Sequence, residues 1–117
     1  KLETDYEHRL VSLEARESIW LATTEISSEL GKPLDFMPRI FYYEVWKNIE
    51  APSVLSDISK YVDKKRQMLE AFTSQMSTSG WINGSLGRNA YRGVTTKGNG
   101  YYEVFETENV TIGELIP

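Results

Sequence analysis

One run of residues constrains the fold of this chain more than any other. Residues 39–46 (RIFYYEVW) are mostly β-branched or aromatic. Such a composition is typical of a strand buried on both faces, as in a parallel sheet covered by helices. A single buried strand cannot form a sheet, because its edges need hydrogen-bonding partners. We therefore expect an incomplete sheet, which an upstream segment of the protein or a partner chain completes.

The segments around this run alternate in type. Residues 7–30 carry apolar side chains at helical spacing, and Gly31 follows as a stop signal. A second helix is expected from a cap at Ser56 or Asp57 to Met76. Its Lys and Arg residues are interpreted as a solvated face.

The rest of the chain is less regular. Residues 77–100 are rich in Ser, Thr, Asn and Gly and are expected to form one long polar loop, whereas residues 101–106 resemble a short strand. The order helix, strand, helix, loop, strand indicates an α/β protein, with residues 1–117 forming a single partial domain.

Composition excludes several classes of function. The net charge is −4, which argues against nucleic-acid binding driven by phosphate neutralisation. No window approaches the roughly twenty apolar residues of a membrane span. The chain has no Cys, so thiolate metal sites and disulfides are excluded, and a reducing, cytoplasmic location is expected.

Two segments carry a resemblance to a known family. Residues 54–75 (VLSDISKYVDKKRQMLEAFTSQ) resemble a helix of the LmbE-like, or PIG-L-like, zinc-dependent N-deacetylases. Residues 88–93 (RNAYRG), followed by residues 100–105 (GYYEVF), are similar to the closing signature of that family, with Tyr102 where Ala is more usual. The strand expected at residues 40–44 falls where the family places its last core strand.

The resemblance implies the C-terminal part of a Rossmann-like layered fold with a mostly parallel sheet. It also implies hydrolysis of the amide in N-acetylglucosamine-type substrates, with release of acetate. The family's Ala-His-Pro-Asp-Asp turn, which supplies two zinc ligands and a general base, has no counterpart in these residues. Zinc therefore requires ligands outside this chain, and the isolated chain is expected to be inactive. The alternative is a non-catalytic carbohydrate-binding or structural subunit, and a homo-oligomer stays open.

The resemblance places candidate site residues at the start of the first helix. His8 aligns with the third zinc ligand of the family, and Asp5 stands where many members have a second His that polarises the amide. Glu7 could accept a hydrogen bond from the ring of His8. The residues alone also allow Asp5 to be the helix N-cap and Glu7 to complement the helix dipole.

Four further residues are candidates for substrate binding. Glu44 and Trp46 follow the expected strand, at the carboxyl end where open α/β sheets bind ligands. Arg88 and Arg92 could contact anions or sugar hydroxyls, although a surface role is equally consistent. Glu103 could pair with one of these arginines and fix the loop.

Overall fold

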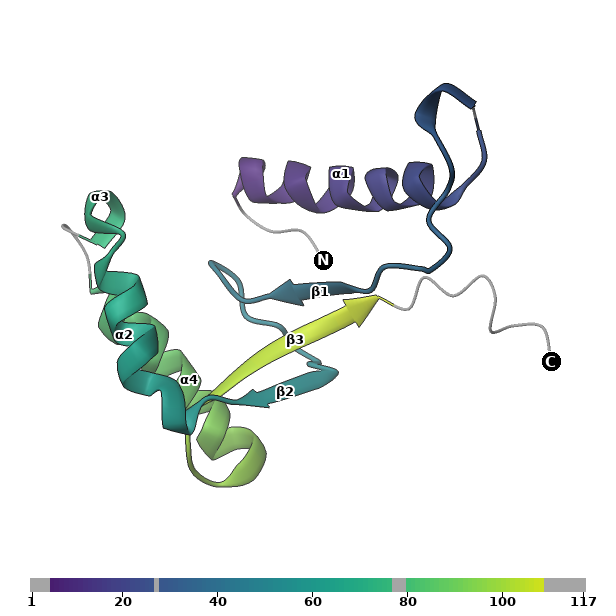
Figure 1. Cartoon of the computed structure of the whole chain (residues 1–117). Helices are drawn as coiled ribbons and strands as arrows, with labels where there is room; N and C mark the ends of the chain where they lie inside the picture. Colours follow the sequence, from purple (N-terminus) through teal and green to yellow (C-terminus); the bar gives the residue numbers. More distant parts are fainter. Residues whose placement is uncertain (1–4, 27, 77–79, 109–117) are drawn as a thin grey trace. The chain divides into compact units, whose positions relative to one another are not determined.

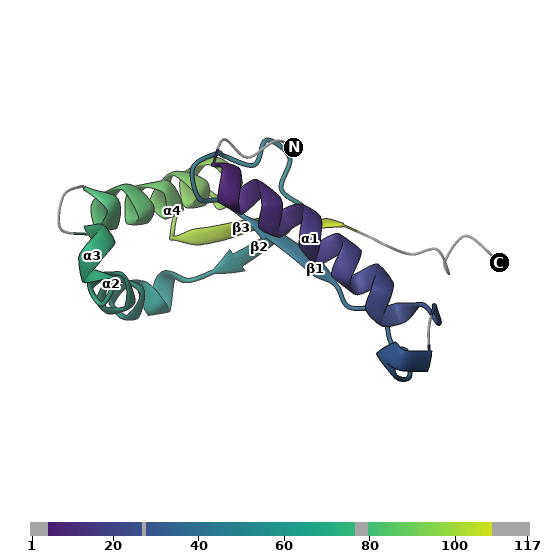
Figure 2. The same cartoon turned by 90° about the horizontal axis from the view of Figure 1, so that it is seen from above.

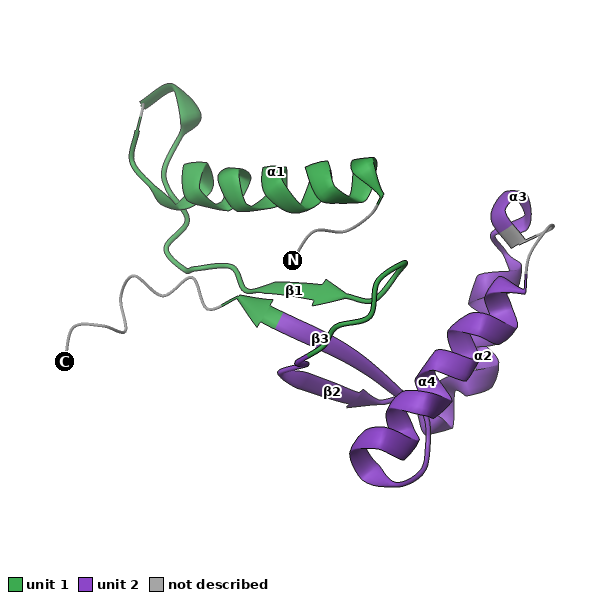
Figure 3. Ribbon diagram, turned by 180° about the vertical axis from the view of Figure 1, so that it is seen from behind, with its two compact units in different colours: residues 1–50, 107–117 green, residues 51–106 purple. Residues whose placement is uncertain are grey.

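The computed structural model describes residues 5–26, 28–76 and 80–108 of the chain (Figure 1). The chain divides into two compact units (Figure 3). Unit 1 comprises residues 1–50 and 107–117, and unit 2 comprises residues 51–106. The expected single domain is thus organised as two units, and each is described by itself.

Unit 1 begins with helix α1 (Tyr6–Thr23), which is followed by a short 3-10 helix (Ser28–Leu30). The helix predicted over residues 7–30 is confirmed up to Thr23. It ends there because Thr24 adopts an extended conformation, with φ −117° and ψ 134°. The backbone N–H of Leu34 then donates to the carbonyl of Ala22 at 2.8 Å, which folds the following segment back onto the helix end.

Strand β1 (Ile40–Tyr43) is shorter and more exposed than predicted. Ile40 and Tyr42 are half-buried on one face, whereas Phe41 and Tyr43 on the other face are 47% and 67% exposed. The expectation that this strand is buried on both faces is therefore wrong for the described residues. The run is apolar enough for a central strand, but Phe41 and Tyr43 on its second face keep about half or more of their surface open to solvent.

Polar contacts tie α1 to the sheet within unit 1. The carboxylate of Glu108 forms an ion pair with Arg16 of α1, and it accepts a hydrogen bond from the Tyr42 hydroxyl at 2.7 Å. The helix and β1 run in opposite directions (Figure 1, Figure 2), so the start of α1 and the end of β1 lie at the same end of unit 1.

The strands form an open antiparallel sheet in the order β1-β3-β2. Val54 in β2 (Val54–Asp57) pairs with Phe105 in β3 (Tyr102–Glu108), and Asp57 pairs with Tyr102. The α/β class is confirmed, but these three strands do not form a parallel sheet. The segment between β2 and β3 explains the antiparallel pairing of these two strands. Helix α2 leads the chain away from the end of β2 and α4 leads it back to the same end of the sheet, so β3 runs in the opposite direction.

In unit 2, β2 leads into a 3-10 turn (Ser59–Tyr61), helix α2 (Val62–Glu70), a short α3 (Thr73–Met76) and α4 (Trp81–Lys97). The helix expected after Asp57 and up to Met76 is thus divided into the 3-10 turn, α2 and α3, and its expected cap residues, Ser56 and Asp57, are the last two residues of β2. Helices α2 and α4 pack against each other.

Helix α4 replaces most of the polar loop expected over residues 77–100, and that prediction is wrong. The buried residues of the helix are Leu86, Asn89 and Gly93, which are spaced by three and four positions. This is helical spacing, but an amide and a glycine in place of apolar side chains concealed it. Gly98, at φ +84°, ends the helix in the left-handed conformation that glycine adopts most readily.

The core of the described residues is small. Its buried apolar side chains are Ile49 in unit 1 and Leu86 and Val104 in unit 2. No helix within the described ranges is both long and apolar enough to cross a membrane.

Candidate functional site

The start of α1 is built around Asp5. Its Oδ1 accepts a hydrogen bond from the backbone N–H of His8 at 3.1 Å, and its own backbone is extended, as is usual at a helix N-cap. The capping interpretation of Asp5 is therefore confirmed. The contact uses only the main chain of His8 and leaves its imidazole outside the cap.

The side chains of the first turn are open to solvent. His8 and Glu7 are both exposed, and Glu7 is the acidic residue of the first turn, where its charge complements the helix dipole. An exposed imidazole on a capped and regular helix is sterically accessible to a metal ion or a substrate.

The segment after β1 is held by Glu44. Its Oε1 accepts a hydrogen bond from the backbone N–H of buried Ile49 at 2.7 Å, which closes the connecting loop. Trp46 lies within this loop and is 53% exposed. The structure thus brings the segments that carry Asp5, His8, Glu44 and Trp46 to one end of unit 1 (Figure 1).

These residues do not by themselves form a metal site. Across the part of the chain that the structure describes, there is no group of three or more His, Asp or Glu side chains that could hold a metal ion. A zinc site needs at least three protein ligands, and His8 provides one imidazole. The donor set of the described residues therefore does not fit a complete zinc site.

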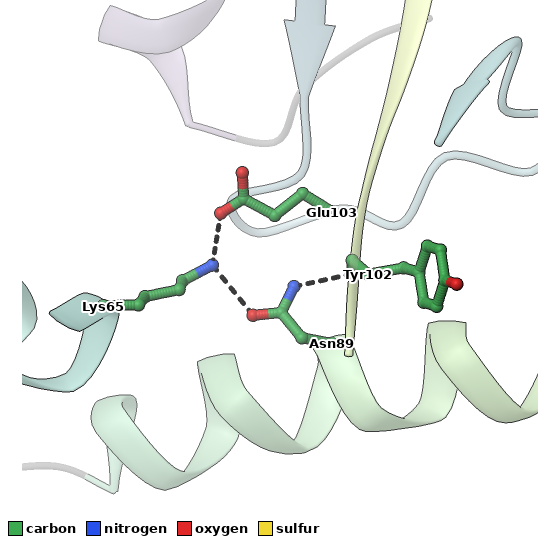
Figure 4. A network of polar contacts seen from close by, with 4 residues as sticks. All are labelled: Lys65, Asn89, Tyr102 and Glu103. Atoms are coloured by element: carbon green, nitrogen blue, oxygen red, sulfur yellow. Dashed lines mark hydrogen bonds and ion pairs between the residues drawn. The ribbon is translucent and has the colours of Figure 1, made fainter. Parts of the chain in front are cut away.

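A polar network occupies the centre of unit 2 (Figure 4). The ammonium Nζ of Lys65 lies 2.6 Å from Oε1 of Glu103 and 2.8 Å from Oδ1 of Asn89. The Nδ2 of Asn89 in turn donates to the carbonyl of Tyr102 at 2.9 Å. The network joins α2, α4 and β3, and each polar atom of Asn89 has a partner.

No local feature of the sequence predicts this network. Lys65 was interpreted as part of a solvated face, but its side chain is only 15% exposed. Glu103 was expected to pair with an arginine, and the partner found is Lys65. The signal for Asn89 was its helical spacing from Leu86 and Gly93, which only becomes visible once the segment is known to be a helix.

A second cluster lies where β2 meets β3. The Oδ1 of Asp57 accepts from the backbone N–H of Ser59 at 2.9 Å, and its Oδ2 accepts from the Tyr102 hydroxyl at 3.3 Å. Hydrogen bonds from the side chain and backbone of Ser59 are the main reason that the pKa of Asp57 is lowered. Desolvation, followed by the charge of Asp57, raises the pKa of Tyr102. The side chain of Asp57 therefore holds the turn after β2, whereas its predicted role as a helix N-cap is wrong, since Ile58 precedes the 3-10 turn and Tyr61 precedes α2.

Gly93 allows α4 to approach the turn before β3. A Cβ atom added at Gly93 would overlap the carbonyl oxygen of Gly100 and would lie 2.8 Å from the carbonyl oxygen of Asn99. Because both atoms belong to the backbone, no side-chain movement can relieve the overlap. Gly93 is thus required for this packing.

Arg88 and Arg92 lie on α4 and not on a loop. They are four residues apart, so they share one face of the helix, and both are half-buried. Both belong to unit 2, whereas the other candidate site residues belong to unit 1.

Comparisons of the chain with protein-family models, with curated proteins and with solved structures gave no match. The family expectation therefore depends on the sequence segments named above.

Proposed function

We propose that this chain is the C-terminal portion of a zinc-dependent de-N-acetylase that acts on N-acetylglucosamine-type substrates. One observation carries the proposal: the two segments on which the resemblance depends fold against each other. Lys65 lies in the first segment and Asn89 and Glu103 lie in the second, and hydrogen bonds join all three. Segments that build one substructure of a fold are expected to be in contact in this way.

Under this proposal, His8 is a zinc ligand, and Glu7 orients its ring. Glu44 and Trp46, at the same end of unit 1, contact the substrate, and Asp5 primarily holds the first turn of α1. The position of His8 suits this role, since the imidazole is exposed while the backbone of the turn is fixed by Asp5.

Zinc held by His8 together with ligands outside this chain would supply a bound water of lowered pKa and would polarise the amide carbonyl. Because this chain provides a single imidazole, the other ligands and the general base would come from an upstream segment or from a partner chain. The same segment would add the remaining strands of a mostly parallel, Rossmann-like sheet. A reducing, cytoplasmic location is part of the proposal, since the chain contains no Cys.

The test is the zinc content of the chain, alone and joined to the segment that precedes it in its parent protein. We expect near-stoichiometric zinc and acetate release from N-acetylglucosamine derivatives only in the joined protein. His8→Ala should abolish both, whereas Glu14→Ala, at another exposed position of α1, should retain both. The joined protein without zinc, or with zinc content unchanged by His8→Ala, would refute the proposal. Zinc bound by the chain alone would refute the assignment of the missing ligands.

A second candidate is a non-catalytic carbohydrate-binding module. The observation that favours it is the exposure of aromatic side chains on and after β1, namely Phe41 (47%), Tyr43 (67%) and Trp46 (53%). Aromatic faces of this kind stack on sugar rings. The test is the binding of N-acetylglucosamine oligomers by the joined protein in the presence of a chelator. Binding that persists there, in a joined protein that holds no zinc, would favour this candidate. Absence of binding would exclude it.

A further inference from the structure

The chain contains two Asn-Gly pairs, and both lie in unit 2. Asn83-Gly84 is in the first turn of α4, and Asn99-Gly100 is in the turn between α4 and β3. Both asparagines are exposed to solvent. An asparagine that precedes a glycine can react with its own backbone, because the glycine has no side chain to hinder the attack. The two pairs therefore place the same chemistry in two different backbone settings.

The reaction has two steps. The backbone nitrogen of the glycine bonds to Cγ of the asparagine, and the side-chain nitrogen leaves as ammonia with the proton of the glycine N–H, so a cyclic succinimide forms. Water then opens the ring at one of its two carbonyl carbons, which gives aspartate or isoaspartate. In isoaspartate the main chain runs through the side-chain carbons, and the former main-chain carbonyl becomes a free carboxylate.

The first pair is protected by its helix. The N–H of Gly84 donates to the carbonyl of Gly80 at 2.7 Å, and Leu86, two residues further on, is buried. To bring its Cγ onto the nitrogen of Gly84, Asn83 has to leave the helical conformation. The first turn of α4 must therefore open before Asn83 can react.

The second pair lies in a turn that lacks this protection. Asn99 stands between Gly98 and Gly100, whose φ values are +84° and +82°, and it lies outside the helices and strands. Within the described ranges, neither the N–H of Gly100 nor the side chain of Asn99 takes part in a hydrogen bond. The attacking nitrogen and the amide under attack can thus meet without the loss of a hydrogen bond.

We propose that Asn99 is a site of spontaneous deamidation, and that isoaspartate at this position loosens unit 2. The carbonyl oxygen of Asn99 lies 2.8 Å from the position of a Cβ atom built on Gly93, a buried residue of α4. In isoaspartate this oxygen belongs to an ionised carboxylate, which is pressed against the packed side of the helix. A charge at such a place is costly unless a partner satisfies it.

The rearranged turn also acts on the sheet. Isoaspartate adds one carbon to the main chain directly before Gly100. The N–H of Tyr101 donates to Oγ of Ser59 at 3.0 Å, and its carbonyl accepts from the N–H of Ile58 at 2.9 Å. Both contacts lie at the beginning of the pairing between β2 and β3, so a displaced Gly100 weakens this end of the sheet. The reaction requires water alone and neither zinc nor a partner chain.

The experiment follows deamidation of the full chain during incubation at mildly alkaline pH. Peptide mapping by mass spectrometry measures the reaction at each asparagine, and electron-transfer fragmentation distinguishes isoaspartate from aspartate. In the folded chain we expect Asn99 to react at least about fivefold faster than Asn83, the factor that one backbone hydrogen bond provides. In the chain unfolded by urea, the two rates should be similar. Equal rates in the folded chain, or a faster reaction at Asn83, would overturn the proposal.

Two variants separate the reaction from its consequence. Asn99→Gln retains an amide, but closure of its larger ring is slow, so incubation should leave its urea midpoint unchanged. Asn99→Asp has the charge of one product on an unaltered backbone, and at this exposed position it should keep the midpoint of the unmodified chain. Chains that contain isoaspartate, separated by ion exchange, should unfold at lower urea than both variants. An unchanged midpoint of these chains, or an equal decline in incubated Asn99→Gln, would overturn the proposed loosening.

Discussion

Lys65 and Glu103 are 38 residues apart in sequence, yet their charged atoms lie 2.6 Å apart in unit 2. The lysine side chain is 15% exposed and the glutamate side chain 37%. Asn89 accepts a second hydrogen bond from the same ammonium group. The pair thus ties α2 to β3 and, through Asn89, to α4, so one lysine connects three elements of the unit.

Replacing Lys65 should destabilise unit 2 substantially. Lys65→Met retains the length of the side chain but leaves the Asn89 oxygen and the Glu103 carboxylate without their shared donor. We expect a loss of about 2 kcal/mol in the free energy of unfolding, measured by urea denaturation. Arg66→Met, at the next and exposed position, should change it by less than about 0.5 kcal/mol. Equal effects of the two substitutions would show that the ion pair contributes little.

Gly93→Ala tests the close approach of α4 to the turn before β3. The added methyl group would overlap the backbone of Gly100, so we expect a loss of about 3 kcal/mol in unfolding free energy. Gly87→Ala in the same helix has open space around the new methyl group and should raise stability by about 1 kcal/mol through helix propensity. The comparison is made by thermal and urea denaturation. A tolerated Gly93→Ala would contradict the packing described here.

Substitutions of Asp5 separate two contributions to the stability of α1: the hydrogen bond of the N-cap and the negative charge of the carboxylate. Asp5→Ala removes the acceptor for the His8 N–H and should cost about 1 kcal/mol of helix stability, whereas Asp5→Asn retains an acceptor and should cost only a few tenths. Amide hydrogen exchange at His8 reports the difference directly. His8→Ala leaves the backbone N–H in place, so slow exchange at position 8 should persist. Rapid exchange in Asp5→Asn would indicate that charge, and not capping, protects this amide.

The stability of unit 2 should depend on pH through Asp57. Its pKa is lowered in the folded chain, mainly by the hydrogen bonds from Ser59, so the ionised carboxylate favours folding. This stabilisation is fully present above the pKa of the unfolded chain, about 4, and is lost as the pH falls through the lower folded value. Asp57→Asn should therefore flatten the decline of the urea midpoint below about pH 4. Asp35→Asn, in unit 1, should leave the decline unchanged, and an identical flattening in both would exclude Asp57 as its cause.

Local patterns were sufficient for part of the fold. The helix that became α1 was predicted from its periodicity and the cap from Asp5. The strand expected over residues 101–106, from its aromatic and β-branched residues, corresponds to β3 (Tyr102–Glu108). In each case the information lies within a few neighbouring residues. The prediction failed for α4, whose packing face consists of Leu86, Asn89 and Gly93 and therefore lacks a continuous apolar stripe.

The residues of the candidate site also differ in whether a local sequence pattern identifies them. The sequence patterns point to His8 and Trp46, which are exposed, and to Glu44, which is half-buried, and the binding of metal or substrate by these residues is still a prediction. They do not point to Lys65 or Asn89, because a lysine among other cations and an asparagine among small residues give no local signal. Their roles depend on partners from other elements.

The sequence by itself determined the α/β class, the capped first helix and the acidic balance of the chain, since these depend on local propensity and on charge. Only the tertiary structure decided the antiparallel pairing of β2 with β3, the helical state of residues 81–97 and the inward position of Lys65. The physical reason is that a buried ammonium or amide is stable only where distant residues satisfy it. Glu103 and Tyr102 provide that satisfaction, and their positions are fixed by the fold as a whole.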